Sequence, residues 1–109
     1  MVPDLHWWTY ILQCRDGSYY VGSTSDLASR IQVHQSAAGP RYTAARLPVR
    51  LVYSERHSTL QQAIRRERQI KRWSRSKKAA LIAGDAATLQ ALSRCREVSR
   101  RSGSHRTNF

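Results

Sequence analysis

The chain of 109 residues has the length of a single domain. It carries a formal net charge of +12, contains only two cysteines, and has no apolar run near the length of a membrane span. These features exclude a transmembrane protein, a disulfide framework and a cysteine zinc site. No signal-peptide pattern is visible at the N-terminus, so we expect a cytoplasmic protein.

The positive charge is concentrated in two places. Eight of the 19 Lys and Arg residues lie in residues 61–78, where Glu67 is the only acid, and five Arg residues lie in residues 94–106. A basic patch and a basic tail indicate a polyanionic partner. Nucleic acid is favoured over an anionic membrane, because the basic segment has few large apolar residues. We expect no membrane contact and no small-molecule cofactor.

Two strands are predicted near the N-terminus. Residues 8–14 are rich in aromatic and β-branched side chains, Asp16-Gly17 is a typical turn dipeptide, and a second strand-forming run follows. This pattern predicts an antiparallel hairpin with Tyr10 and Tyr20 on opposite arms. Cross-strand packing alone would explain these tyrosines, so the hairpin pattern by itself assigns them no chemistry.

A helix is predicted after the hairpin. The spacing in residues 26–37 is helical and follows a Ser-Asp pair that can cap the helix N-terminus. Leu27 and Ile31 lie four residues apart and are expected to face the core. Arg30 and His34 have the same spacing and are expected to lie just beside this buried stripe.

The remaining elements are shorter. Residues 41–47 are predicted to form a basic loop, and residues 49–55 alternate as a third strand. Three helices are then expected, over residues 60–74, 76–83 and 86–95, with caps at the start of the first and last.

The resulting order, β-β-α-β-α-α, predicts an α+β fold in which a small, mostly antiparallel sheet of three strands is flanked by helices, followed by a C-terminal helix and a basic tail. Residues 1–84 are predicted to form the main domain. Residues 85–96 form the C-terminal helix in this prediction, and residues 97–109 form a disordered basic tail because they lack apolar spacing.

Glu67 is the most informative residue of the basic helix. Helical rotation places it on an apolar stripe formed by Leu60, Ala63, Ile64 and Ile70. A carboxylate on a buried stripe is unfavourable unless it is paired or bound to a cation. Spacing alone favours an ion pair with Lys71. The alternative is a ligand for Mg²⁺, which needs only one or two carboxylates when water and a substrate phosphate complete its shell.

Short motifs on the two hairpin arms are followed by polar residues on the next helix. The arms carry Trp-Thr-Tyr, ending at Tyr10, and Tyr-Val-Gly, starting at Tyr20, and the helix carries Asp26, Arg30 and His34. These residues resemble a GIY-YIG nuclease domain, in which the arms carry Gly-Ile-Tyr and Tyr-Ile-Gly. The later run AIRRERQIKRWSRSKKAALI is similar to the small stand-alone bacterial members. The resemblance covers residues 6–84.

The resemblance implies that the protein cuts phosphodiester bonds with one divalent ion, Mg²⁺ or Mn²⁺, held at Glu67. Tyr10 stands at the position of the tyrosine thought to take the proton from the attacking water, and Tyr20 stands at its partner position. Arg30 matches the arginine that faces the scissile phosphate, and His34 matches a position that assists proton transfer in some members. Because a free tyrosine has a pKa of about 10, Arg30 and the cation are expected to lower the pKa of Tyr10.

The function implied in this way is a metal-dependent DNA endonuclease of low sequence specificity, acting on damaged, branched or single-stranded DNA in repair or processing. A protein partner that supplies specificity is left open. The side chains expected to bind nucleic acid are basic or aromatic: Arg41, Tyr42, Arg46, Arg65, Arg66, Arg68, Lys71, Arg72, Arg75, Lys77 and Lys78. For Tyr42, a purely structural role is equally favoured.

Two other functions compete with the nuclease. A non-catalytic DNA- or RNA-binding module is the main alternative, and the basic tail and the altered first motif favour it. The five retained polar residues of the motif argue against it, because a carboxylate facing phosphate would repel the ligand unless a metal intervened. A protein-interaction scaffold is less favoured, since the charge clusters on one helix.

Overall fold

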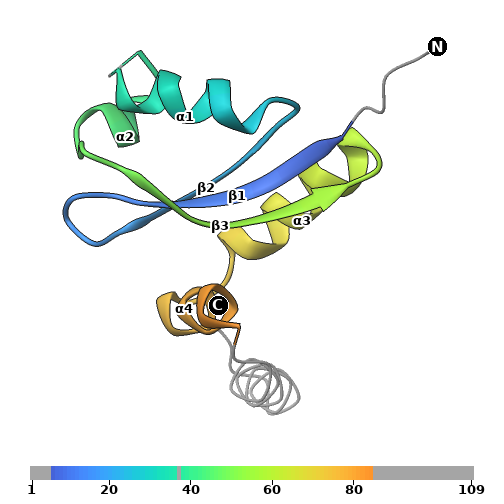
Figure 1. Ribbon diagram of the computed structural model, residues 1–109. Helices are drawn as coiled ribbons and strands as arrows, with labels where there is room; N and C mark the ends of the chain where they lie inside the picture. The colour runs from blue at the N-terminus through green and yellow to red at the C-terminus, as the bar shows by residue number, and fades with distance from the viewer. Residues whose placement is uncertain (1–5, 37, 85–109) are drawn as a thin grey trace. The chain divides into compact units, whose positions relative to one another are not determined.

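The computed structural model describes residues 6–36 and 38–84 (Figure 1). The chain divides into two compact units, Met1–Arg68 and Gln69–Phe109, which are described separately. The elements in chain order are β1 (Trp7–Gln13), β2 (Tyr19–Thr24), α1 (Leu27–Gln35), α2 (Arg41–Ala44), β3 (Arg50–His57), α3 (Leu60–Lys71) and α4 (Arg75–Ala83). The predicted C-terminal helix (85–96) and tail (97–109) lie outside the described residues.

The three strands form one sheet in the order β2-β1-β3, and both strand pairs are antiparallel. The predicted α+β class and the predicted antiparallel sheet are therefore confirmed. Strand β1 lies in the centre, and its residues 9–12 are buried whichever way they point, because both faces of the sheet are covered. In the pairing with β2, Tyr10 lies opposite Gly22 and Thr9 lies opposite Ser23.

The two faces of the sheet are covered by different helices. Successive strand residues point to opposite faces, so Thr9 and Tyr10 point in opposite directions. The Tyr10 hydroxyl contacts His34 of α1, whereas the Thr9 hydroxyl contacts the carbonyl of Ala63 in α3. Helix α1 therefore lies over one face and the first part of α3 lies over the other.

The core on the α1 face contains the buried residues Tyr10, Leu12, Cys14 and Val49. The predicted stripe of α1 is confirmed, since Leu27 and Ile31 are partly buried and pack against this cluster. The predicted stripe of α3 is correct only in part. Ala63 is fully buried, but Leu60, the first residue of the helix, is 41% exposed.

In the first unit, the observed secondary structure differs from the prediction in three elements. Helix α1 is N-capped by Asp26, whose carboxylate accepts from the backbone N–H of Ser29, and it ends at Gln35, earlier than predicted. The predicted loop 41–47 contains α2, which was missed because a helix of four residues is too short to display an apolar period. Strand β3 begins one residue later and ends two residues later than predicted.

In the second unit, α4 follows α3 after a short break. The side chain of Ser74 caps α4 by accepting from the N–H of Lys77, so α3 ends before residue 74. Gly84 ends α4 with a φ of 72°, a left-handed conformation that favours glycine. Within residues 6–36 and 38–84, no helix has the length and apolar character needed to cross a membrane.

Candidate active site

A buried line of polar groups begins at Tyr10. Its hydroxyl lies 3.0 Å from Nε2 of His34, and Nδ1 of His34 lies 2.8 Å from the hydroxyl of Thr43 in α2. Tyr10 is 2% exposed, and His34 and Thr43 are fully buried. His34 was predicted to lie just beside the buried stripe of α1. In the structure its imidazole is itself buried and connects Tyr10 of β1 with Thr43 of α2.

A row of aromatic rings continues from this line toward the surface. The Tyr20 ring lies with its centroid 5.1 Å from that of His34 and 6.5 Å from that of Tyr10. Tyr42 follows, 6.2 Å from Tyr20, and its ring carries the Arg46 guanidinium at 3.9 Å. Tyr20 is only partly buried and Tyr42 is exposed, so the row runs from a dry interior to solvent.

Gly22 explains why the second motif ends in glycine. A Cβ atom at this position would lie 2.5 Å from the Tyr10 hydroxyl and 2.7 Å from the ring carbon that bears it. The Tyr10 side chain therefore crosses β2 at Gly22, where only a residue without a side chain leaves room. This crossing brings the hydroxyl of Tyr10 toward β2, the edge strand of the sheet.

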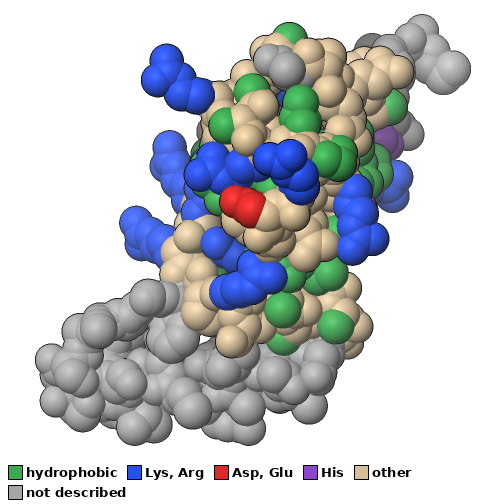
Figure 2. Space-filling view, turned by 90° about the vertical axis from the view of Figure 1, so that its left-hand side faces the viewer, with side chains coloured by type: hydrophobic (Ala, Val, Ile, Leu, Met, Phe, Trp, Pro, Cys, Tyr) green, Lys and Arg blue, Asp and Glu red, His purple; other side chains and the backbone are tan. Residues whose placement is uncertain are grey.

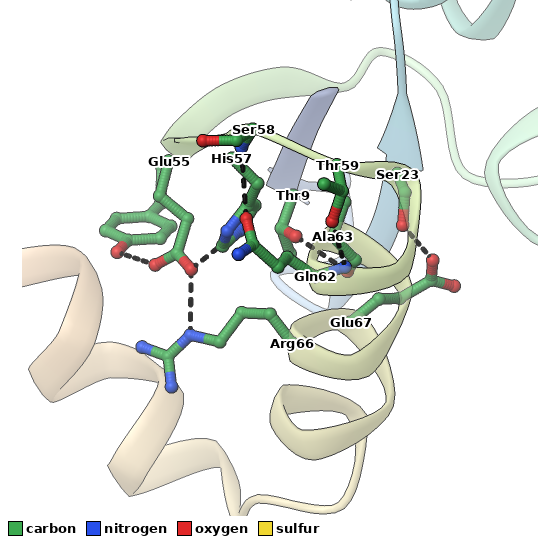
Figure 3. Close-up of polar contacts among 11 residues, drawn as sticks. Thr9, Ser23, Glu55, His57, Ser58, Thr59, Gln62, Ala63, Arg66 and Glu67 are labelled. Atoms are coloured by element: carbon green, nitrogen blue, oxygen red, sulfur yellow. Dashed lines mark hydrogen bonds and ion pairs between the residues drawn. The ribbon is translucent and has the colours of Figure 1, made fainter. Parts of the chain in front are cut away.

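Glu67 approaches the same strand from the other face of the sheet. Its Oε1 accepts a short hydrogen bond from the hydroxyl of Ser23, the residue after Gly22 (Figure 3). One turn earlier in α3, the carbonyl of Ala63 accepts a hydrogen bond of 2.9 Å from the buried Thr9 hydroxyl. The helix that carries Glu67 is thus attached to both β1 and β2. The predicted ion pair with Lys71 stays a prediction.

The charges around Tyr10 connect the predicted site residues. Burial is the largest effect and raises the pKa of Tyr10 above its usual value, and repulsion from Tyr20, when that phenol is ionised, and from the Glu67 carboxylate raises it further. The positive charge of Arg30 lowers the Tyr10 pKa but does not outweigh burial. Without a bound cation, desolvation of the phenolate therefore outweighs Arg30, and the expected lowering of the Tyr10 pKa by Arg30 and a cation together stays a prediction.

Arg30 and His34 also act on each other. Arg30 is exposed on α1, and its charge reaches the imidazole of His34 as well as Tyr10. Burial first and the Arg30 charge second lower the pKa of His34, so the imidazole is neutral at neutral pH. Together these effects bring Arg30, His34, Tyr20 and Glu67 within direct or electrostatic reach of Tyr10.

A divalent ion suits Glu67 only in part. Among the described residues, no group of three or more His, Cys, Asp and Glu side chains could hold a metal. Glu67 nevertheless offers a hard carboxylate oxygen at a partly buried position, and the Ser23 hydroxyl beside it is a second oxygen donor. Such a donor set fits Mg²⁺ or Mn²⁺ if water and a substrate phosphate complete the shell.

The basic side chains predicted to bind nucleic acid differ in their surroundings. Figure 2 shows Lys and Arg side chains on the side turned toward the viewer, with few acidic side chains among them. Six of the predicted residues are exposed cations: Arg41, Arg65, Arg68, Lys71, Arg72 and Arg75. Arg46 and Arg66 are partly buried and form ion pairs with Asp16 and Glu55.

Two lysines of α4 have less favourable positions for contact with nucleic acid. Lys77 is 4% exposed, and its ammonium lies 4.2 Å from the centre of the Trp73 ring. Lys77 was predicted to bind nucleic acid, and this prediction needs correction. Its side chain is buried against the Trp73 ring and is not available to a ligand. Lys78 is partly buried, and burial lowers the pKa of its ammonium.

Three residues with functional contacts escaped the sequence-based prediction. The role of Thr9 could have been suspected from the sequence, because a polar residue stands in a strand where the family motif has an apolar one. Ser23 and Thr43 gave no such indication, since hydroxyl residues are common in strand ends and loops. Their partners, Glu67 and His34, lie 44 and nine residues away in the sequence.

Comparison with known proteins places this arrangement in a family. A model of the GIY-YIG catalytic domain matches residues 6–80, and the chain belongs to the GIY-YIG nuclease family. The chain is 46% identical over 79 residues to a UPF0213 protein of Staphylococcus saprophyticus, and this match covers 72% of the chain and 95% of the relative. It is 45% identical over 69 residues to a UPF0213 protein of Streptococcus pneumoniae, covering 63% and 70%.

Two solution structures are also similar. A protein from E. faecalis is 26% identical with a TM-score of 0.50, and the match covers 100% of both chains. A UPF0213 protein from Bacillus halodurans is 40% identical with a TM-score of 0.49, and the match covers 74% of this chain and 86% of that one. The match of the GIY-YIG catalytic-domain model confirms the family expected from the short motifs.

Proposed function

We propose that the protein is a divalent-metal-dependent DNA endonuclease that hydrolyses phosphodiester bonds with low intrinsic sequence specificity. The observation that carries this proposal is the electrostatic environment of Tyr10. Its buried hydroxyl contacts His34, and Tyr20, Arg30 and Glu67 all affect its ionisation. A structural ion pair or a stacking cluster would not need a carboxylate (Glu67), an imidazole (His34) and a guanidinium (Arg30) around the phenol of Tyr10.

Glu67 is the residue that would hold the divalent ion. A bound cation would supply positive charge at the phosphate and make the attacking water a better nucleophile. The hydroxyl of Ser23 orients the carboxylate through its hydrogen bond, as outer groups commonly do for metal ligands. Arg30, exposed at the site, stabilises the negative charge that develops on the phosphoryl oxygens.

The roles of the two tyrosines follow from their exposure. Tyr10 is almost completely buried and its pKa is raised, so it is poorly suited to meet the attacking water. Tyr20 is partly exposed and lies between His34 and solvent. We therefore assign to Tyr20 the contact with the water, which the resemblance had given to Tyr10, and to Tyr10 and His34 the hydrogen-bonded support behind it.

Nucleic acid would be held mainly through phosphate contacts. Among the side chains predicted to bind nucleic acid, the exposed cations of the first unit are Arg41, Arg65 and Arg68, and those of the second unit are Lys71, Arg72 and Arg75. Contacts of this kind carry little sequence information, so we expect selection by DNA structure, in damaged, branched or single-stranded substrates, rather than by sequence.

The decisive experiment is a cleavage time course on labelled single-stranded, duplex and branched DNA, with and without Mg²⁺ or Mn²⁺. The isosteric variant Glu67→Gln should lose at least about 100-fold in rate while it still binds DNA. Asp16→Asn is the matched control, because this exposed carboxylate lies at the hairpin turn and pairs with Arg46, a contact in which an asparagine oxygen can still accept. It should cleave like the wild type.

Two results would contradict the proposal. One is the absence of metal-dependent cleavage on every substrate, with DNA binding retained, which would favour the non-catalytic binding module. The other is metal-dependent cleavage that survives unchanged in Glu67→Gln.

A further inference from the structure

Thr43 has a position that the proposed chemistry does not explain. It lies in α2, a helix of one turn, and its side chain is fully buried. Its hydroxyl lies 2.8 Å from Nδ1 of His34 and donates to the carbonyl of Pro40 at 3.2 Å. A threonine in a short surface helix needs no such arrangement for packing alone, since valine has the same shape.

The hydrogen bonds around His34 have one consistent direction. The carbonyl of Pro40 can only accept, so it takes the single hydroxyl proton of Thr43. The Thr43 oxygen must then accept from Nδ1–H of His34. A neutral imidazole that carries its proton on Nδ1 has a bare Nε2, which accepts the hydroxyl proton of Tyr10.

We propose that Thr43 is a positioning residue, which holds His34 in its Nδ1-protonated tautomer so that Nε2 accepts from the Tyr10 hydroxyl. This inference rests on the proposed function only for its catalytic consequence. With its proton directed to Nε2, the Tyr10 oxygen presents only lone pairs to the site. A group next to it, the hydroxyl of Tyr20 or a water molecule, must then donate to Tyr10 rather than accept from it.

The surroundings of His34 support a neutral imidazole. The titratable and charged groups that face it are Tyr10 from β1, Tyr20 from β2 and Arg30 from its own helix, and Thr43 is the neutral group from α2. No carboxylate among the described residues forms an ion pair with His34. A hydroxyl acceptor at Nδ1 selects the tautomer without adding the charge that would favour the imidazolium.

Two variants of Thr43 separate the hydroxyl from the shape. Thr43→Val keeps the branched shape and removes the hydroxyl, whereas Thr43→Ser keeps the hydroxyl and removes a methyl group. The tautomer of His34 is read from the nitrogen and carbon shifts of the imidazole by NMR at neutral pH, with His34→Gln to assign the signals. The wild type should show Nδ1–H, Thr43→Ser should retain it, and Thr43→Val should show the Nε2–H form or a mixture.

The same variants should show a graded loss of cleavage. We expect Thr43→Val to cleave about 10- to 100-fold more slowly than the wild type, and Thr43→Ser to recover most of that loss. The tautomer measurement needs no enzymatic activity, so it stands even if the proposed nuclease function fails. An Nε2–H tautomer in the wild type, or an unchanged Nδ1–H tautomer in folded Thr43→Val, would overturn the inference while leaving the nuclease proposal intact.

Discussion

At the scale of single residues, burial has a larger effect than charge in this site. Tyr10 lies near Arg30, and a positive charge by itself would make the phenol more acidic. The pKa of Tyr10 is nevertheless raised, because the hydroxyl is removed from water and repulsion from Tyr20 and Glu67 adds to this effect. His34 is affected in the opposite direction, since burial and Arg30 both lower its pKa. Both groups are therefore neutral in the resting protein at neutral pH.

These shifts predict how stability depends on pH. The folded chain binds a proton at His34 less readily than the unfolded chain, so stability is lost as the pH falls below about 6.5. The unfolded chain ionises at Tyr10 before the folded chain does, so stability is also lost as the pH rises above about 10. Thermal unfolding measured across this range should show a broad maximum, with a weaker acid decline in His34→Gln and a weaker alkaline decline in Tyr10→Phe.

A second tyrosine, Tyr53, should contribute to the same alkaline decline, and Tyr53→Phe measures its share separately. Burial and the hydrogen bond to Glu55 raise the pKa of Tyr53 to about 12, so this variant should also weaken the decline, by an independent contribution. An alkaline decline that Tyr10→Phe leaves unchanged would show that Tyr10 is not desolvated in the folded protein.

At the scale of elements, the attachment of α3 to the sheet determines where Glu67 lies. The Thr9 hydroxyl binds the carbonyl of Ala63, which in an α-helix also accepts from the N–H of Glu67, four residues later. Figure 3 shows this contact and the Ser23–Glu67 contact at neighbouring positions of the helix. The altered residue in the first motif is thus a structural contact to the helix that carries the carboxylate.

Substitutions of Thr9 should distinguish the contribution of its hydrogen bond to Ala63 from that of side-chain packing. Thr9→Val keeps the shape but removes the hydrogen bond, and the free energy of unfolding should fall by about 1 kcal/mol. Cleavage should fall with it, because the helix that carries Glu67 loses its hydrogen bond to β1. Thr9→Ser, which retains the hydroxyl, is the matched control and should bind the Ala63 carbonyl. Equal stability of Thr9→Val and the wild type, measured by urea unfolding, would contradict this role.

At the scale of the whole molecule, the basic side chains fall into two groups: some are exposed to solvent and others form ion pairs with acidic side chains. Arg65 and Arg68 are exposed on α3, whereas Arg66 lies between them in sequence and donates to Glu55 at 2.9 Å. Helical geometry therefore divides one run of basic residues into solvent-facing cations and a structural ion pair. Sequence counting alone treats all of them as equivalent.

This division predicts the salt dependence of DNA binding. The dissociation constant of the wild type should rise steeply between low and physiological salt. The double variant Arg65→Ala, Arg68→Ala should reduce the logarithmic salt slope by up to about 0.9 for each duplex phosphate that the variant no longer neutralises. Arg66→Ala is the matched control and should change the slope less, while it lowers thermal stability. A dissociation constant that does not respond to salt would refute binding through phosphates.

Much of the fold could be predicted because it depends on local patterns. The hairpin follows from strand-forming residues around Asp16-Gly17, and the start of α1 follows from Asp26 as its N-cap. The one-turn helix α2 could not be predicted in this way, since four residues contain no complete apolar period. Lys77 could not be recognised as buried, because its contact with the Trp73 ring depends on the break between α3 and α4.

From the sequence alone, the antiparallel sheet was predicted from strand-forming residues around a turn, and the family from the resemblance of short motifs to GIY-YIG domains. The five polar residues proposed for catalysis came from the same resemblance. Only the tertiary structure decided how those residues are supported. The contacts of Thr43 with His34 and of Thr9 with Ala63 join separate elements. The raised pKa of Tyr10 also required the structure, since desolvation depends on everything packed around a group and not on its neighbours in the chain.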